Sequence, residues 1–127
     1  MEVNERDISI IEHISSYCSD IIEATERFGK SIEEFRSDKD YRNACALCIL
    51  QIGELCWNLS EDFRSRYNEI PWREVKTMRN IVAHRYGRIS IEATWETIET
   101  DIPELKAFCD RIINSSQEEK EKKNVQE

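Results

Sequence analysis

The sequence predicts an all-α fold, an up-and-down bundle of four to five helices. Apolar residues recur every three or four positions along almost the whole chain, which is the period of a helix with one buried face. Only three Gly and two Pro occur in 127 residues, so a fold of many strands would lack turn signals. A chain of this length suits a single core. We therefore expect one helical domain over residues 1–116, followed by a tail over 117–127.

The first half of the chain predicts two long helices separated by a short one. Apolar positions from Ile8 to Phe28 step by three or four, which predicts a first helix of about 25 residues. Gly29 is suited to its C-terminal cap, and Ser31 to the N-cap of a short helix over 32–35. Asp38 or Asp40 is expected to open the next helix, over 41–58.

The helix over 41–58 is predicted to bury one apolar side. Gly53 lies inside it and costs roughly 1 kcal/mol relative to Ala, so we expect it to allow a close approach of another helix. Ser60 is a suitable N-cap for a short helix that ends near Tyr67. The expected buried side comprises Ala44, Leu47, Cys48, Ile52, Leu55 and Cys56.

The second half predicts two further helices. Pro71 suits the first turn of a helix from Trp72 to about His84, and Gly87 ends that unit. Ser90 is expected to cap the last helix, in which Pro103 implies a kink or a break. Residues 117–127 contain one apolar side chain in eleven, so this charged tail is expected to be disordered. The expected buried face of the last helix comprises Ile91, Trp95, Ile98, Ile102, Leu105, Phe108 and Ile112.

Charge is distributed unevenly along the chain. The window from Arg64 to Arg88 holds seven Lys/Arg and two acids, a net charge of +5, which leaves −13 on the remainder of a chain of net charge −8. Such a basic island is a plausible polyanion site, although a solvated basic face paired with acids is an equal alternative. The candidate phosphate-binding cations of this island, apart from Arg79, are Arg73, Lys76, Arg85 and Arg88.

Cysteine usage and hydropathy indicate a cytoplasmic protein. The five cysteines are an odd number in a chain with no apolar signal segment, so we expect them to be reduced and buried rather than paired in disulfides. No run of about 18 apolar residues is present to span a membrane. We also expect no cofactor and no metal. Trp57, Trp72 and Trp95 are expected in the core, and His13 is expected to be structural.

The segment from Arg79 to Tyr86 gathers the groups needed for acid–base chemistry beside a phosphate. Histidine exchanges protons near neutral pH, and arginine holds a phosphate through two hydrogen bonds. On a continuous helix Asn80 and His84 would lie about 40° apart, so Asn80 could orient the His84 ring. One copy supplies one proton carrier, whereas RNA cleavage without a metal needs a base and an acid. A symmetric homodimer would supply the second.

These residues resemble the Arg-x4–6-His signature of HEPN domains and, more closely, the HepT-like family of ribonuclease toxins from HEPN–MNT toxin–antitoxin systems. The resemblance covers about residues 4–113. It includes Arg79, Asn80, His84 and Tyr86 together with the flanking sequences over 52–54, 70–74, 95–98 and 101–105. An Arg-x4-His pattern alone is weak, but with Tyr86 and ordered flanking matches it is specific.

The resemblance implies a role for each matching position. His84 would be the general acid/base, Arg79 the phosphate-binding cation and Asn80 a supporting residue. Tyr86 would be the tyrosine to which the cognate nucleotidyltransferase antitoxin transfers AMP. Family members act as homodimers on RNA, including transfer RNA. Relatives often carry an acidic residue at the position of Arg85. The arginine would either strengthen RNA binding or make His84 less basic.

Two other functional classes compete with the ribonuclease. The dimer could be a non-catalytic nucleotide- or RNA-binding regulatory partner of a nucleotidyltransferase, which the net charge of −8 favours. A purely structural helical protein would require the Arg79–Tyr86 cluster to be accidental. Each site residue also has a structural alternative, such as a capping His84, a salt-bridged Arg79 or a core Tyr86.

Overall fold

The computed structural model describes residues 3–75 and 90–126, with side chains through residue 124. Every regular element within these ranges is helical, which confirms the all-α class. The elements are α1 (Glu5–Phe28), α2 (Ile32–Ser37), α3 (Lys39–Asn58), α4 (Glu61–Arg66), α6 (Ile91–Glu96), a π-helical turn η1 (Thr97–Asp101) and α7 (Ile102–Gln126).

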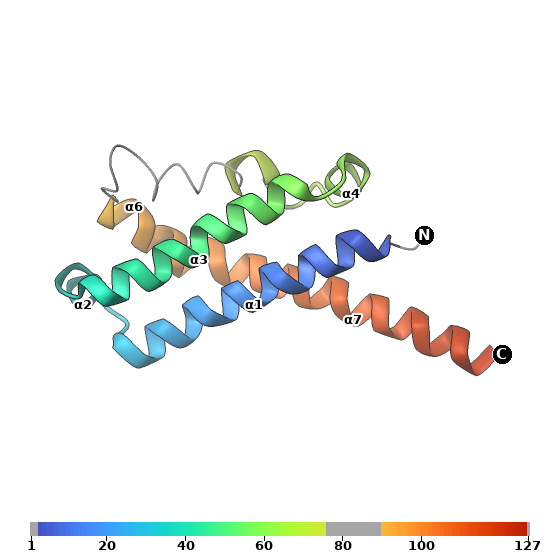
Figure 1. Cartoon of the computed structure of the whole chain (residues 1–127), viewed down its shortest axis with the longest axis horizontal. Helices are drawn as coiled ribbons and strands as arrows, with labels where there is room; N and C mark the ends of the chain where they lie inside the picture. Colours follow the sequence, from blue (N-terminus) through green and yellow to red (C-terminus); the bar gives the residue numbers. More distant parts are fainter. Residues whose placement is uncertain (1–2, 76–89, 127) are drawn as a thin grey trace.

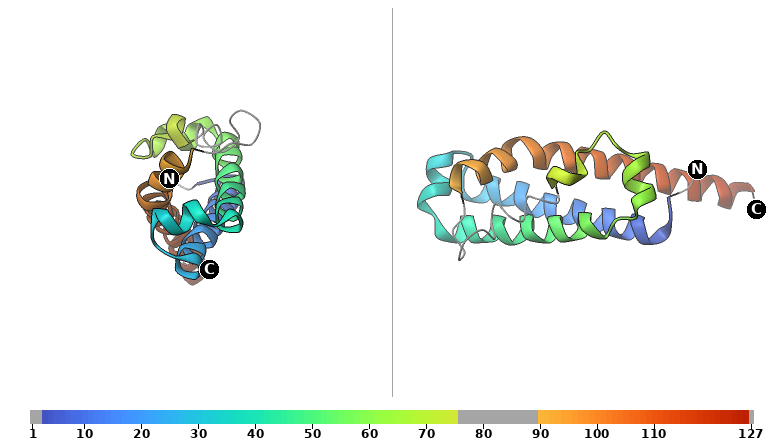
Figure 2. Two further views of the ribbon diagram at one scale, coloured as in Figure 1. Left: turned by 90° about the vertical axis from the view of Figure 1, so that its left-hand side faces the viewer. Right: turned by 90° about the horizontal axis from the view of Figure 1, so that it is seen from above.

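Three long helices form the body of the bundle. The first, α1, packs against both α3 and α7 (Figure 1). The short helix α2 lies at one end of this body and contacts α6, whereas α4 lies near the other end of α3. The C-terminal part of α7 extends beyond the other helices (Figure 2). The core lies where α1, α3 and α7 meet.

The buried faces of α1 and of the last helix are those that the apolar spacing predicts. On α1 the positions from Ile8 to Ile21 are at most 8% exposed, and Phe28 at its end is 37% exposed. On the last helix every expected position from Trp95 to Ile112 is buried. Aromatic rings of α2, α3 and α6 complete one end of the core, where Phe35 lies 5.1 Å from Tyr41 between ring centroids.

Side-chain caps fix where the helices begin. The side chains of Ser31, Asp38, Ser60 and Ser90 accept hydrogen bonds from backbone N–H groups of the first turns of α2, α3, α4 and α6. These caps confirm the expected starts and select Asp38 over Asp40. Gly29 ends α1 with φ +127°, a conformation that residues with a Cβ rarely adopt. The order of the elements is therefore encoded locally by the residues between them.

A buried carboxylate joins the start of α1 to the start of α4. Asp7 is 1% exposed, and it accepts hydrogen bonds from the Ser60 backbone N–H at 2.9 Å and the Ser60 hydroxyl at 2.6 Å. Asn4 Nδ2 donates to the same carboxylate at 2.9 Å. Ser60 Oγ in turn accepts from the backbone N–H of Phe63 at 3.1 Å. One acid therefore positions two helix N-termini that are separated by more than fifty residues.

The predicted buried side of α3 is partly wrong. Ile52 and Cys56 are buried as expected, but Ala44 is exposed and Leu47 is 58% exposed. The core face instead comprises Tyr41, Cys45, Ile49, Ile52, Gly53 and Cys56. The periodicity misleads here because apolar residues occur on both sides of α3, so several faces fit the sequence equally well. Trp57 is also misplaced by the prediction, since it is 57% exposed, whereas Trp72 and Trp95 are buried as expected.

The chain does not break at Pro103. The helix continues through it because η1 precedes it, with the backbone N–H of Ile102 donating to Thr97 O, five residues earlier. Proline lacks an N–H and crowds the carbonyl four residues before it, so a wider π turn accommodates it. The expected break is thus absent, and a local change of helix type takes its place.

The charged tail is helical through Gln126, which differs from the disorder that its composition predicts. Glu118 precedes Lys122, and Glu119 precedes Lys123, by four residues, a spacing that supports helices in solution. All described side chains from residue 117 to 124 are exposed. The domain boundary at residue 116 stays a prediction.

The five cysteines carry free thiols, and Cys18, Cys45, Cys56 and Cys109 are buried. Burial raises the pKa of Cys18 and of Cys45 to about 12, and raises those of the other three thiols as well. Because the thiolate is the reactive form, these groups are expected to be inert at pH 8. Cys48 is half-buried and is the most accessible of them.

We therefore expect Ellman's reagent to detect no more than one thiol per folded chain, and only slowly. All five should react after denaturation. The absorbance of the released thiol at pH 8, followed with and without denaturant, measures this. Two or more rapidly reacting thiols in the folded protein would contradict the assignment of the cysteines to the core.

Candidate functional site

The proposed catalytic segment lies between two described anchors. Arg79, Asn80, His84 and Tyr86 lie outside the described residues, as do the candidate phosphate-binding residues Lys76, Arg85 and Arg88. Their assignment stays a prediction. Arg73 is described and is exposed on the helical turn formed by residues 72–75.

Trp72 anchors the chain just before the segment. Its side chain is 7% exposed and packs against Phe63 and Phe108, with ring centroids 6.0 and 5.7 Å away. Its indole Nε1–H donates to the carbonyl oxygen of Tyr67 at 2.9 Å. Val75, the last described residue before the segment, is also buried. Trp72 and Val75 hold the core side of this turn, which leaves Arg73 on the solvent side.

The chain after the segment is anchored by α6. Ser90 Oγ accepts the backbone N–H of Ala93 at 3.3 Å and so fixes the first turn. Trp95 packs against Phe35 and Tyr41, with ring centroids 5.4 and 6.3 Å away. Both ends of the candidate segment are therefore attached to the core through a tryptophan.

The described part of the basic island is mixed in character. Arg66 forms an ion pair with Asp62 at 3.2 Å, and its guanidinium lies 5.9 Å from the centroid of the Tyr67 ring. That pairing fits the structural alternative for a basic face. Arg73 is exposed and stays a candidate for phosphate binding.

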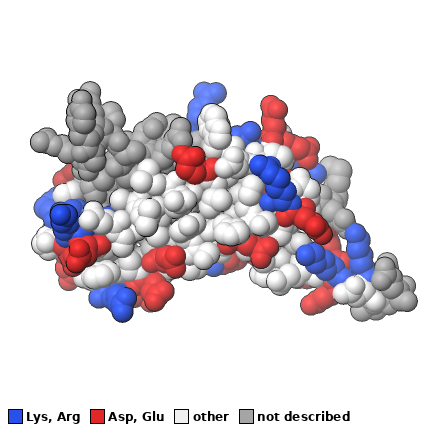
Figure 3. Space-filling view, viewed as in Figure 1, with Lys and Arg blue, Asp and Glu red and all other residues white. Residues whose placement is uncertain are grey.

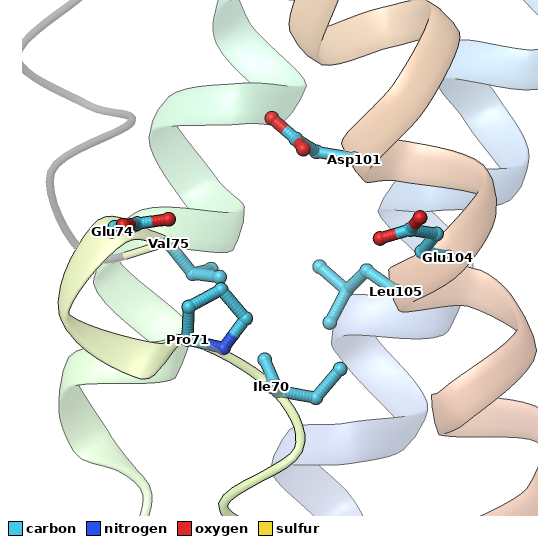
Figure 4. A pocket seen from close by; sticks show the side chains of 7 residues that line it. All are labelled: Ile70, Pro71, Glu74, Val75, Asp101, Glu104 and Leu105. Carbon is cyan, nitrogen blue, oxygen red and sulfur yellow. The ribbon is translucent and has the colours of Figure 1, made fainter.

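A small acidic hollow borders Val75 (Figure 4). It is lined by Ile70, Pro71, Glu74, Val75, Asp101, Glu104 and Leu105. Burial raises the pKa of Asp101, and repulsion from Glu104, Glu96 and Glu74 raises it further. Carboxylates of like charge repel phosphate, so the described residues that line this hollow do not favour binding of the RNA backbone. Sequence reasoning missed it because Glu74 and Asp101 are far apart along the chain.

Replacing Asp101 with asparagine is expected to stabilise the protein at neutral pH. A raised carboxyl pKa means that the folded state disfavours the charged form of Asp101. The protein is therefore most stable at pH values below the pKa that Asp101 has in the unfolded chain. Its stability falls as the pH rises through the pKa that Asp101 has in the folded protein. Because Asp101 is largely exposed, screening limits the gain at pH 7 to about 0.5 kcal/mol. Urea unfolding at pH 7 and pH 3 measures it. An equal gain at both pH values would contradict the electrostatic cause.

Two further classes of site are absent from the described parts of the chain. Over residues 3–75 and 90–126, no group of three or more His, Cys, Asp or Glu side chains is placed to hold a metal ion. None of the helices described there is long and apolar enough to cross a bilayer. The expectation of metal-independent chemistry stays a prediction.

Comparison with known proteins identifies the family. A family model described as "Ribonuclease HepT-like" matches residues 11–112. A "Putative RNase" of Methanocaldococcus jannaschii is 34% identical over 115 residues, covering 90% of this chain and 97% of the relative. A "Putative RNase" of Caldanaerobacter subterraneus is 34% identical over 103 residues, covering 81% and 90%.

A third relative carries the family name itself. The "Probable ribonuclease HepT" of Thermococcus cleftensis is 36% identical over 101 residues, covering 76% of this chain and 92% of the relative. No solved structure matches the chain. The family match confirms the ribonuclease class that the sequence resemblance implies. The all-α bundle and this match over most of its length lead to one conclusion: the chain belongs to the ribonuclease HepT-like family.

Proposed function

We propose that this protein is a metal-independent endoribonuclease, the toxin of a HEPN–MNT toxin–antitoxin system that acts on RNA in the cytoplasm. The observation that carries the proposal is the family match over residues 11–112, which includes the segment from Arg79 to Tyr86. The two tryptophan anchors, Trp72 and Trp95, support it because they fix both ends of that segment on the core.

The proposed chemistry is an internal transfer at phosphorus. The 2′-oxygen of a ribose forms a bond to phosphorus while the bond to the 5′-oxygen of the next nucleotide breaks. His84 of one subunit removes the 2′-hydroxyl proton, and His84 of the partner subunit protonates the leaving oxygen. Arg79 binds the phosphate and offsets its developing charge, and Asn80 orients the histidine. Arg73, Lys76, Arg85 and Arg88 would hold the flanking phosphates.

Tyr86 is the proposed point of control. A cognate nucleotidyltransferase antitoxin would transfer AMP to its hydroxyl, forming a phosphodiester and releasing pyrophosphate from ATP. The added adenylate places a bulky anion two residues from His84. It would then repel the phosphates of RNA and block access to the site.

The function is tested with purified protein and total or transfer RNA in the presence of a chelator. Wild type should cleave and leave 2′,3′-cyclic phosphate ends, whereas His84→Ala should be slower by at least about a hundredfold, the usual contribution of a general acid or base. His13→Ala is the matched control, because His13 is exposed on α1, where its Nδ1 lies 2.7 Å from Ser9 O. Undiminished cleavage by His84→Ala would refute the proposed role.

A regulatory partner subunit that binds RNA or nucleotide without cleaving it is the second candidate. The net charge of −8 favours it. Folded wild-type protein that binds RNA but leaves it intact at all enzyme concentrations would select this function.

A further inference from the structure

A second hollow lies between α1 and η1, at the end of the bundle that holds α2 and α6 (Figure 1). Its volume is about 360 Å³, within the range of about 300–1,000 Å³ that is usual for small-molecule sites. Its inner wall is apolar, because Trp95 and Ile98, which are 7% and 4% exposed, line it together with Ile22 and Pro103. We call it the α1–η1 hollow. It is large enough to take a small ring system.

The π turn η1 helps to form this hollow. In a continuous α-helix Ile98 and Pro103, which are five residues apart, would lie about 140° apart around the helix axis. A π turn joins residues five apart within about one turn, so both side chains line the same hollow. Single π turns inside α-helices occur frequently at functional sites. The change of helix type therefore has a possible use beyond the accommodation of proline.

Three polar side chains border the hollow, and the hydrogen-bonding role of each is fixed. Thr25 Oγ1 donates its proton to Ile22 O at 2.7 Å, so toward a ligand it can only accept. The carboxylate of Glu99 is also an acceptor, and the ammonium group of Lys30 is a donor. Both charged groups are exposed, and neither is bonded to another described residue. The bordering side chains thus offer a ligand two acceptors and one donor.

This set of groups is complementary to the edge of one RNA base. The Watson–Crick edge of guanine carries two donors, N1–H and the 2-amino group, and one acceptor, O6. Adenine, cytosine and uracil each carry a single donor on that edge. An apolar side chain of a protein partner would leave all three polar groups without partners. A phosphate would meet one cation beside a carboxylate, which is a poor anion site.

We propose that the α1–η1 hollow binds a guanine base. The N1–H and 2-amino groups donate to Glu99 and Thr25, O6 accepts from Lys30, and the ring packs against the apolar wall. Recognition through a base suits this protein, because on the face shown in Figure 3 the described Lys and Arg side chains lie among Asp and Glu rather than in one patch. Such a surface attracts phosphates weakly, whereas base contacts provide selectivity.

The guanine can belong to RNA or to a free nucleotide, and only the RNA source rests on the proposed function. Calorimetric titration of the full-length protein with GMP, IMP and AMP tests the free nucleotide. GMP should bind at least about tenfold more tightly than IMP, which lacks the 2-amino group, because a hydrogen bond to a charged group contributes about that factor or more. AMP should bind more weakly still.

Two variants test whether the hollow is the site. Glu99→Gln should weaken GMP binding at least about tenfold, because it removes the charged acceptor. Glu96→Gln is the matched control: it removes the same charge at an exposed position of α6 that does not border the hollow, so it should bind GMP as wild type does. Circular dichroism checks that each variant is folded. Unchanged GMP binding by Glu99→Gln would overturn the proposal.

The RNA source is tested by fluorescence anisotropy with a short labelled RNA that contains one guanine. The protein carries His84→Ala and the buffer contains a chelator, so that the RNA stays intact. Replacing the guanine with inosine should weaken binding about tenfold, and adding Glu99→Gln should remove this difference. A guanine preference in the RNA alone, or with GMP alone, would identify the source of the base.

The outcomes separate this proposal from the proposed function. Equal binding of GMP and AMP, together with no effect of inosine in the RNA, would overturn the guanine site even if the wild type cleaves RNA. Absence of cleavage by a wild type that prefers guanine would refute the proposed function and leave the site in place.

Discussion

Replacing Asp7 with alanine is expected to lower the free energy of unfolding by about 3 kcal/mol, because it strands several buried donors at once. The Ser60 N–H, the Ser60 hydroxyl and Asn4 Nδ2 all donate to this carboxylate. Without it the Ser60 hydroxyl also loses the partner that orients it as the cap of α4. Chemical denaturation followed by circular dichroism measures the loss.

The control for Asp7 is another aspartate on the same helix. Asp20 is exposed on α1, so Asp20→Ala should stay within about 0.5 kcal/mol of wild type. If both variants lose the same stability, the effect comes from helix charge rather than from the contact between α1 and α4. If Asp7→Ala unfolded at the same denaturant concentration as wild type, the role of that contact would be refuted.

Trp72→Ala is expected to cost about 4 kcal/mol, the usual range for removing a large aromatic side chain from a core. The change removes the contacts of the Trp72 ring with Phe63 and Phe108. It also removes the hydrogen bond from the indole N–H to the carbonyl oxygen of Tyr67. It also frees the chain that enters the proposed catalytic segment. Ribonuclease activity per folded molecule should therefore fall as well, and denaturation with RNA cleavage measures the two effects separately.

Trp72→Phe separates packing from hydrogen bonding. It keeps an aromatic ring but loses the indole N–H, so the cost should be about 1 kcal/mol and activity should largely survive. A phenylalanine variant as unstable as the alanine variant would show that the hydrogen bond, rather than the ring packing, holds this turn.

The sequence predicts most of the fold where local signals act alone. Ser31, Ser60 and Ser90 cap helices as expected, because a capping side chain bonds to its own first turn and needs no tertiary contact. The face of α3 is predicted less well, since apolar residues surround that helix and its packing against other helices, α1 above all, decides which are buried. Leu47 and Trp57 are misplaced for this reason.

The candidate site is predicted by chemistry and family pattern rather than by packing. The pattern of Arg79 and His84 fits a family signature, but a pattern gives no information on distant neighbours. The acidic hollow shows the difference: Glu74 and Asp101 meet only because residues 70–75 pack against Leu105. The link between Asp7 and Ser60 is likewise invisible in the sequence, since fifty-three residues separate the two.

The π turn at η1 makes the protein sensitive to chain length at this point. Residues 91–126 form one continuous rod, and a helix rotates by about 100° for each residue added or removed. Deleting one residue between Thr97 and Asp101 would turn α6 around the rod, so that Trp95 would no longer face Phe35 and Tyr41. Length changes in evolution should therefore be rarer here than in the loop between α4 and Trp72.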